Sequence, residues 1–194
     1  GPDSEMFYWK NNSEPAPEVF DPKNKNWVEI WNDVFMIYVK NEDGKIVDAA
    51  QKNIDTGMGL ERAVAVLNGK DNVYDTDIFE DILKKIPAEL EQKQKRIIAD
   101  HSRAINALIT DGVEPSNKER GYVLRRLIRR IVAYEFLSKK EFLEDLITSP
   151  IFIEERSKFL KTLENGIAEY NRIGEINADK AFLLYQSFGL PFDI

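Results

Sequence analysis

The sequence predicts an α+β fold, in which an antiparallel sheet near the N-terminus is followed by an all-helical part. Residues 27–56 are rich in β-branched and aromatic side chains around a turn signal, whereas after residue 57 apolar residues recur at helical spacing. The 194 residues, 43% hydrophobic and 31% charged, suffice for a buried core in one domain or two small ones. No apolar run reaches about 18 residues, so we expect no membrane-spanning segment.

The first 56 residues supply the predicted sheet. Residues 1–26 contain several prolines and are expected to form an exposed loop, because proline obstructs regular structure. Residues 27–40 favour a strand buried on both faces, since they are largely apolar. The sequence Asn-Glu-Asp-Gly-Lys at 41–45 indicates a turn, after which residues 45–55 predict a short return strand.

The rest of the chain has apolar residues at helical spacing. We expect helices at 60–69, 76–86, 89–110, 119–136, 139–148, 154–172 and 178–187. Gly69 fits the end of the first of these helices, and residues 111–117 interrupt the pattern between the third and the fourth. The predicted organisation is therefore a sheet-bearing domain over 1–74 and a helical domain over 75–194.

Charge is distributed unevenly along the chain, whose formal net charge is −7. Residues 120–134 contain five arginines and no acidic residue, so the remaining 22 basic and 34 acidic residues give a net charge of −12. Exposed charges are screened beyond about 8–10 Å at physiological salt. An acidic total therefore does not exclude a local site for an anion or for nucleic acid.

The cysteine and histidine counts exclude several kinds of site. With no cysteine, the chain forms no disulfide and no Cys-ligated zinc or iron–sulfur site. A single histidine, His101, argues against a His-rich metal site and a His-based catalytic triad. We therefore expect no zinc site in this chain.

A glycine-containing turn at 55–62, with the sequence Asp-Thr-Gly-Met-Gly-Leu-Glu-Arg, joins the return strand to the first helix. Gly57 and Gly59 permit close approach of a ligand to the backbone, and the helix N-terminus favours an anion. Asp55 is suited to a cationic group and Arg62 to a phosphate. The pattern matches neither a Walker loop nor a dinucleotide fingerprint, so local chemistry alone favours a plain strand-to-helix turn.

The Gly-x-Gly-x-Glu-Arg segment at 57–62 resembles motif 3 of the class II aminoacyl-tRNA synthetases, and within that class the chain resembles the alanyl-tRNA synthetases. The resembling blocks occur in the family's order at 1–5, 28–36, 55–62, 98–104, 111–130, 159–166 and 181–194. The resemblance implies the C-terminal part of a class II antiparallel sheet followed by a helical domain that recognises the tRNA acceptor stem.

The resemblance implies a role in alanine and ATP binding for five residues. Asp55 would face the α-amino group of alanine, and Val34 would line the small side-chain pocket. Gly57 and Gly59 would lie beneath ATP and the adenylate, and Arg62 would contact an ATP phosphate. The alternative for Arg62 is an ordinary surface salt bridge.

The family uses ATP as a substrate together with Mg²⁺. Glu29 has two interpretations: a magnesium ligand, or a plain carboxylate on the face of a strand.

In the helical part the family recognises tRNA-Ala, including its G3:U70 pair. The resemblance implies this role for Asn117 and Asp193, whose polar groups suit the minor-groove edge of a wobble pair. Without the resemblance, Asn117 would be interpreted as a helix cap and Asp193 as an ordinary loop residue.

The arginine-rich helix can be interpreted from its spacing. Arg125 and Arg129 are four residues apart, as are Arg126 and Arg130, so they share one broad face that suits phosphate contacts. The alternative is that these arginines form salt bridges with acidic residues at 141–145 and 154–155.

The resemblance begins after motif 2, and the segment expected to follow motif 3 is the tRNA-recognition domain. Motifs 1 and 2 would belong to the remainder of the synthetase chain, so we expect residues 1–194 alone not to form alanyl-adenylate. The implied location is cytoplasmic. The rival hypothesis is a non-catalytic RNA-binding module that retains a relic of the synthetase fold.

Overall fold

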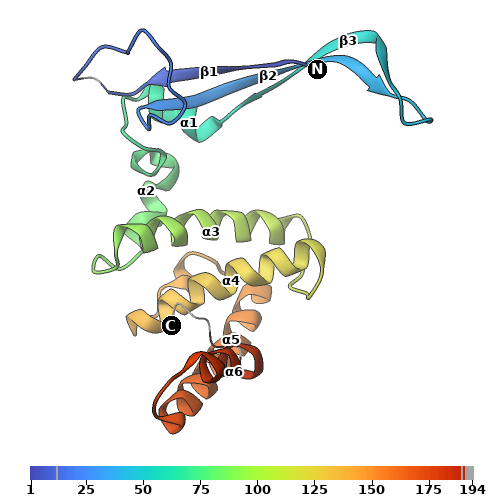
Figure 1. The fold of residues 1–194 in the computed structure, drawn as a ribbon. Helices are drawn as coiled ribbons and strands as arrows, with labels where there is room; N and C mark the ends of the chain where they lie inside the picture. Colours follow the sequence, from blue (N-terminus) through green and yellow to red (C-terminus); the bar gives the residue numbers. More distant parts are fainter. Residues whose placement is uncertain (12, 189, 191–194) are drawn as a thin grey trace. The chain divides into compact units, whose positions relative to one another are not determined.

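The computed structural model describes residues 1–194 except residues 12, 189 and 191–194. The chain divides into two units, Gly1–Glu80 and Asp81–Ile194. The described residues form a three-stranded antiparallel sheet and six α-helices, which confirms the α+β class (Figure 1). No helix in this described part is long and apolar enough to cross a membrane.

The sheet of the first unit has the order β1-β2-β3. It comprises β1 (Asp3–Trp9), β2 (Trp27–Lys40) and β3 (Ile46–Met58). The strand–turn–strand prediction for the second and third strands is confirmed, although β3 is longer than expected. The prediction that residues 1–26 form a loop throughout is wrong, because β1 pairs with β2 from Asp3 opposite Val34 to Trp9 opposite Trp27.

Burial of β2 on both faces was also predicted, and the structure contradicts it. No residue of β2 is fully buried, and Tyr38 and Val39 are about half exposed, at 51% and 50%. Within this unit α1 (Leu60–Leu67) is the helix that contacts β2, and its eight residues are too few to cover a strand of fourteen. The apolar character of β2 therefore reflects strand propensity more than core packing.

The segment between β1 and β2 folds back on the sheet through aromatic contacts. The ring of Phe20 lies 4.7 Å from that of Phe7 and 5.5 Å from that of Trp27, measured between centroids. Trp9 completes the group, with its ring 5.0 Å from that of Trp27. Aromatic pairs at these separations stabilise the packing of the segment on the sheet.

Helix α1 ends as the sequence predicted. Gly69 follows its last turn with φ of +61°, a conformation that glycine adopts without a steric penalty. The Gly69 amide donates to the Val66 carbonyl at 3.1 Å, and the Lys70 amide donates to the Ala65 carbonyl at 2.8 Å. These two bonds satisfy carbonyls that the helix end would otherwise leave free. Helix α2 (Asp77–Lys84) follows a short 3₁₀ turn.

The helical unit has a continuous apolar core. Its helices are α3 (Gln92–Thr110), α4 (Glu119–Ser138), α5 (Pro150–Ile173) and α6 (Ala178–Phe188). Helix α3 packs on α4, α4 on α5, and α5 on α6. Fully buried apolar side chains at their contacts include Ile98, Ile105, Leu124, Ile128, Ile131, Val132, Phe152, Phe159 and Leu163.

The helix predicted at 139–148 is absent from the structure, which has only a 3₁₀ turn at Leu143–Asp145 there. Lys139 ends α4 in the left-handed conformation, with φ of +56°. The segment that follows contacts α4 and α5, and its side chains Phe142 and Ile147 are buried. Tertiary burial therefore overrides a local sequence that would suit a helix.

A buried carboxylate explains why this segment is not helical. Glu135 Oε1 accepts the backbone N–H groups of Phe142 and Leu143, each at 3.0 Å, and Arg156 Nε donates to Glu135 Oε2 at 2.6 Å. Burial by itself lowers the pKa of Arg156, but its hydrogen bond to Glu135 and the negative charges of Glu135 and Glu144 outweigh this and raise the pKa. The charged pair thus holds a non-helical backbone.

Candidate functional site

The predicted alanine-binding residues meet on one face of the sheet. Val34 on β2 lies directly opposite Asp55 on β3, and Asn32 lies directly opposite Gly57. Directly opposite residues in an antiparallel pair, and residues two apart along a strand, point to the same face. The half-buried Val34 therefore lies beside the exposed Asp55, so an apolar side chain and a carboxylate adjoin.

Each of the two glycines of the turn has a close neighbour on β2. A Cβ atom on Gly57 would lie 3.0 Å from Asn32 Oδ1, so a larger residue would press on the neighbouring strand. Gly59 donates its amide to the Ile30 carbonyl at 3.1 Å and is the N-cap of α1, with no side-chain cap. The N-cap residue of α1 thus supplies no side-chain acceptor at the helix N-terminus, the kind of position that favours an anion.

Arg62 reaches from α1 back to β2. Its Nη1 donates to the Glu29 carbonyl oxygen at 2.9 Å and to Glu29 Oε2 at 3.2 Å. The two side chains are 50% and 36% exposed, so the ion pair contributes less than about 1 kcal/mol to stability. The salt-bridge alternative thus describes Arg62, whose partner is Glu29 on β2. The pair is weak enough for a phosphate to replace the carboxylate.

Among the described residues no group of three or more Asp, Glu, His or Cys side chains is placed to hold a metal ion. Glu29 supplies a single accessible carboxylate beside Arg62. Mg²⁺ commonly takes one or two carboxylates and completes its shell with water and substrate phosphates. One carboxylate next to an arginine that is expected to bind phosphate therefore fits a substrate-bridged magnesium ion, and does not fit a cage built from protein ligands alone.

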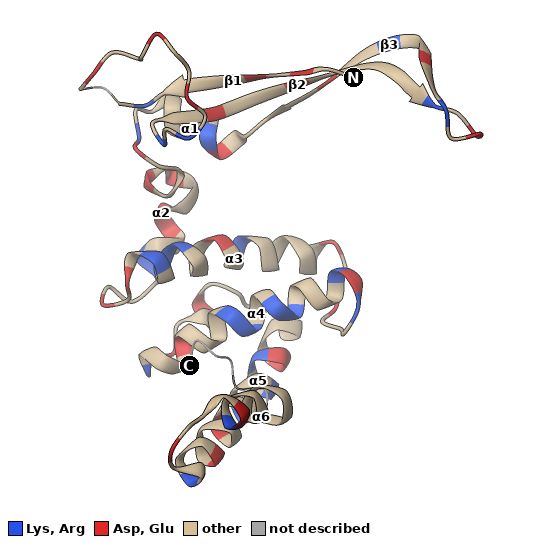
Figure 2. Ribbon diagram, viewed as in Figure 1, with Lys and Arg blue, Asp and Glu red and all other residues tan. Residues whose placement is uncertain are grey.

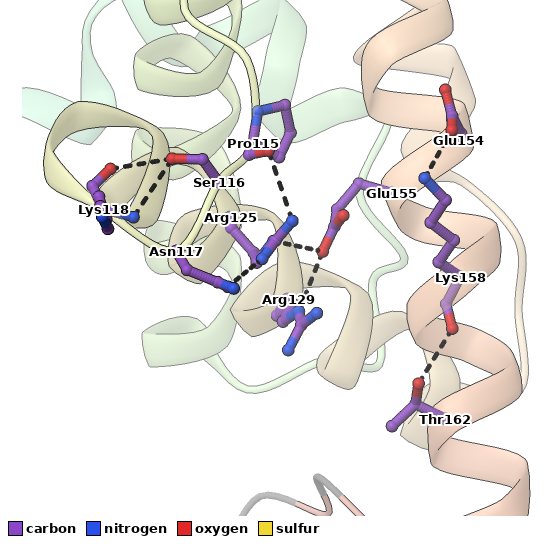
Figure 3. Close-up of polar contacts among 10 residues, drawn as sticks. All are labelled: Pro115, Ser116, Asn117, Lys118, Arg125, Arg129, Glu154, Glu155, Lys158 and Thr162. Carbon is purple, nitrogen blue, oxygen red and sulfur yellow. Dashed lines mark hydrogen bonds and ion pairs between the residues drawn. The ribbon is translucent and has the colours of Figure 1, made fainter.

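Asn117 lies on the exposed turn that precedes α4, and Arg125 donates from Nη1 to its Oδ1 (Figure 3). The alternative that Asn117 caps the helix is wrong, because the N-cap residue is Lys118 and has no side-chain cap. Ser116 closes the turn locally, accepting the Lys118 amide on Oγ at 3.3 Å. Asp193 lies outside the described residues.

The structure divides four of the five arginines of α4, namely Arg125, Arg126, Arg129 and Arg130, into two pairs. Arg125 Nε and Arg129 Nε lie 3.2 and 3.0 Å from the same oxygen, Oε1 of Glu155 on α5 (Figure 3). Arg126 and Arg130 are exposed and form no ion pair within the part of the chain that is described. The salt-bridge alternative therefore accounts for the first pair and leaves the second pair exposed. Figure 2 shows the basic positions that recur along α4.

Two structural features were not specified by the sequence, which gave residues 154–155 together as candidate partners of the arginines. Glu155 is 5% exposed in its side chain, whereas the adjacent Glu154 is 68% exposed and pairs with Lys158. Nothing in their spacing distinguishes the two acids. Gly121 is buried where α4 passes the turn, and only its position in the first helical turn hinted at a close contact.

A family model described as tRNA synthetases class II (A) matches residues 1–151. The chain belongs to this family. Curated relatives of this class II synthetase chain include an alanine–tRNA ligase of Thermotoga petrophila, 38% identical over 232 residues, and one of Francisella tularensis subsp. novicida, 34% identical over 234 residues.

Each of these two alignments includes 100% of the chain but only 27% and 26% of the respective relative. The class II synthetase chain thus spans about a quarter of the length of these relatives. Both alignments are also longer than the chain itself, so the relatives contain inserted residues that it lacks.

Proposed function

We propose that this chain is the part of an alanine–tRNA ligase that contributes motif 3 to the aminoacylation site and recognises the tRNA acceptor stem. The cross-strand pair of Val34 and Asp55 is the observation that carries the proposal. In the intact enzyme the alanine carboxylate attacks the α-phosphate of ATP, which gives alanyl-adenylate and pyrophosphate. Alanine then passes to the 3′ end of tRNA-Ala.

The first unit would bind alanine through complementary charge and size. The Asp55 carboxylate would form a charge-assisted pair with the α-ammonium group. Val34, beside it on the same face, would leave room for a methyl side chain and exclude larger ones. Gly57 and Gly59 would let the adenylate approach the backbone, with the open N-terminus of α1 nearby.

ATP would bind at the end of this face. Arg62 would exchange the Glu29 carboxylate for an ATP phosphate, and the released Glu29 would supply one oxygen to Mg²⁺. The metal ion would neutralise charge on the phosphates. The protein's own contribution is positioning and electrostatic stabilisation of an in-line displacement.

The second unit would bind the acceptor stem. Arg126 and Arg130 are exposed and suited to phosphate oxygens, whereas Asn117, with Asp193, would contact the G3:U70 pair in the minor groove. Arg125 and Arg129 are partly exposed and are paired with Glu155. Phosphate contacts set affinity and register, and base contacts set specificity.

Binding of an acceptor-stem minihelix to residues 1–194 tests this proposal. Binding should weaken with salt, and replacing G3:U70 by G3:C70 should weaken it further. Asn117→Ala should remove that difference, while Asn165→Ala in the remote part of α5 should preserve it. Equal affinity of the unmutated chain for both stems would remove the recognition claim.

The rival, a non-catalytic RNA-binding module, keeps the second unit's role and drops that of the first. An alanyl-adenylate analogue such as alanyl-sulfamoyl adenosine distinguishes the two hypotheses. Only the ligase hypothesis predicts that the chain binds the analogue and that Asp55→Asn weakens this binding. We expect no ATP–pyrophosphate exchange by residues 1–194 alone, since motif 2 supplies the arginine for the α-phosphate. Robust exchange would contradict that expectation.

A further inference from the structure

We infer that Glu155 is a positioning residue for acceptor-stem recognition, acting through Arg125 to fix the orientation of the Asn117 amide. The inference rests on the proposed function of Asn117. Glu155 is a buried carboxylate on α5, whereas the turn that carries Asn117 precedes α4. In this role Glu155 would not itself contact the RNA.

Glu155 is an anion placed between two cations. Its side chain is 5% exposed, and its Oε1 accepts a hydrogen bond from Arg129 Nε at 3.0 Å and lies 3.2 Å from Arg125 Nε. Arg129 also makes a cation–π contact, with its guanidinium carbon 5.2 Å from the centroid of the Phe159 ring. A buried carboxylate with two cationic partners has little freedom to rotate.

The guanidinium of Arg125 connects this carboxylate to the turn. Its Nε forms an ion pair with Glu155 Oε1 at 3.2 Å without a hydrogen bond, whereas Nη1 donates to Asn117 Oδ1 and Nη2 donates to the Pro115 carbonyl at 3.4 Å (Figure 3). The planar group therefore has one edge on α5 and the other on the turn. If the first edge is released, the second is no longer directed at Asn117.

This contact decides which way the Asn117 amide points. A guanidinium only donates, so the atom of Asn117 that faces Arg125 must be the oxygen. The NH₂ group, with two donors, is then left on the exposed side of the turn. It is suited to acceptors such as a uracil O2, a purine N3 or a ribose 2′-hydroxyl in the RNA minor groove.

Loss of the Glu155 charge should have a characteristic effect. Arg125 and Arg129 would repel each other with no anion between them, and Arg125 would turn toward solvent. The surface would gain positive charge, so affinity for the G3:C70 stem should hold or rise and its salt dependence should steepen. Discrimination between stems should fall, because Asn117 would then rotate freely.

The test compares Glu155→Gln with Glu154→Gln, its exposed neighbour on the same helix. Minihelices with G3:U70 and G3:C70 are titrated against the 194-residue chain. In Glu155→Gln the affinity ratio should fall roughly tenfold toward one while affinity for G3:C70 is kept, and Glu154→Gln should leave the ratio unchanged. In an Asn117→Ala background, Glu155→Gln should have no further effect on the ratio.

A second pair of variants keeps the inference testable if Glu155→Gln unfolds. Arg125→Lys retains a cation for Glu155 but cannot donate to Asn117 and Pro115 together, so it should lose discrimination. Arg129→Lys, which leaves the contact to Asn117 intact, should retain it. Equal ratios in both lysine variants, or in both glutamine variants, would overturn the inference.

A measurement without RNA tests the role of Glu155 separately from the proposed function of Asn117. If the unmutated chain does not discriminate between stems, the proposed function fails. Trypsin cleavage after Lys118 then decides whether Glu155 orders the turn. Faster cleavage of Glu155→Gln than of Glu154→Gln, by roughly three- to tenfold, supports the ordering, and equal rates refute it.

Discussion

A methyl group on Gly121 should displace the turn that carries Asn117. Gly121 is buried in the first turn of α4, and its carbonyl accepts the Ser116 amide at 3.0 Å. A Cβ atom there would lie 2.9 Å from Ser116 Cβ and closer still to Ser116 Oγ and the Glu114 carbonyl oxygen. Because one of these groups is backbone, rotation of a side chain alone cannot relieve the overlap.

The magnitude for Gly121→Ala follows from two opposed terms. Overpacking a close contact costs about 1–3 kcal/mol, whereas alanine in place of glycine in a helix returns up to about 1 kcal/mol. The free energy of unfolding should therefore fall by about 1–2 kcal/mol. In a chain of this size that lowers Tm by about 2–8 °C.

Thermal unfolding followed by circular dichroism measures this loss, and minihelix binding measures the displacement of Asn117. Gly166→Ala in α5 is the matched control, because its Cβ atom would lie 3.2 Å from Leu190 Cβ, a milder approach than those at Gly121. That variant should lose less stability than Gly121→Ala. A Gly121→Ala chain at least as stable as the unmutated one, with unchanged discrimination between stems, would refute the reasoning.

Lys139→Gly should raise the free energy of unfolding by about 0.5–1 kcal/mol in urea denaturation, because Lys139 has a φ of +56° that glycine adopts freely. Arg156→Ala should lower it by about 3 kcal/mol in the same assay, since Glu135, 3% exposed, would lose its cationic partner; a change below 1 kcal/mol would contradict this. Arg126→Gln should reduce the salt slope of RNA binding by about 0.7–0.9 without shifting Tm, and an unchanged slope would remove Arg126 from the interface.

Much of the fold was predictable because the signals were local. The turn at 41–45 and the β-branched and aromatic residues around it specify a hairpin of neighbouring strands, and Gly69 ends its helix through the conformation of one residue. Strand β1 was missed although residues 3–9 contain four aromatic or apolar residues in succession. Its partner β2 begins at residue 27, and single-sequence patterns do not report such distant pairing.

The candidate site was likewise predictable from the sequence only in part. The adjacency of Val34 and Asp55 depends on register, which the sequence left open and the β2–β3 pairing decided. The spacing of Arg125 and Arg129 placed both on one helical face, yet did not say which of the two neighbouring arginine pairs faces inward. That outcome depends on Glu155, on a helix more than twenty residues away in the sequence.

The sequence by itself determined the class of fold, the family resemblance and the positive charge of residues 120–134, because composition, motif order and periodicity are properties of the chain. Tertiary structure decided how that charge is used. Packing of α4 on α5 places one carboxylate beside Arg125 and Arg129 and leaves the other three arginines exposed. Electrostatic pairing depends on distance in space, and a net charge of −7 carries no information about distance.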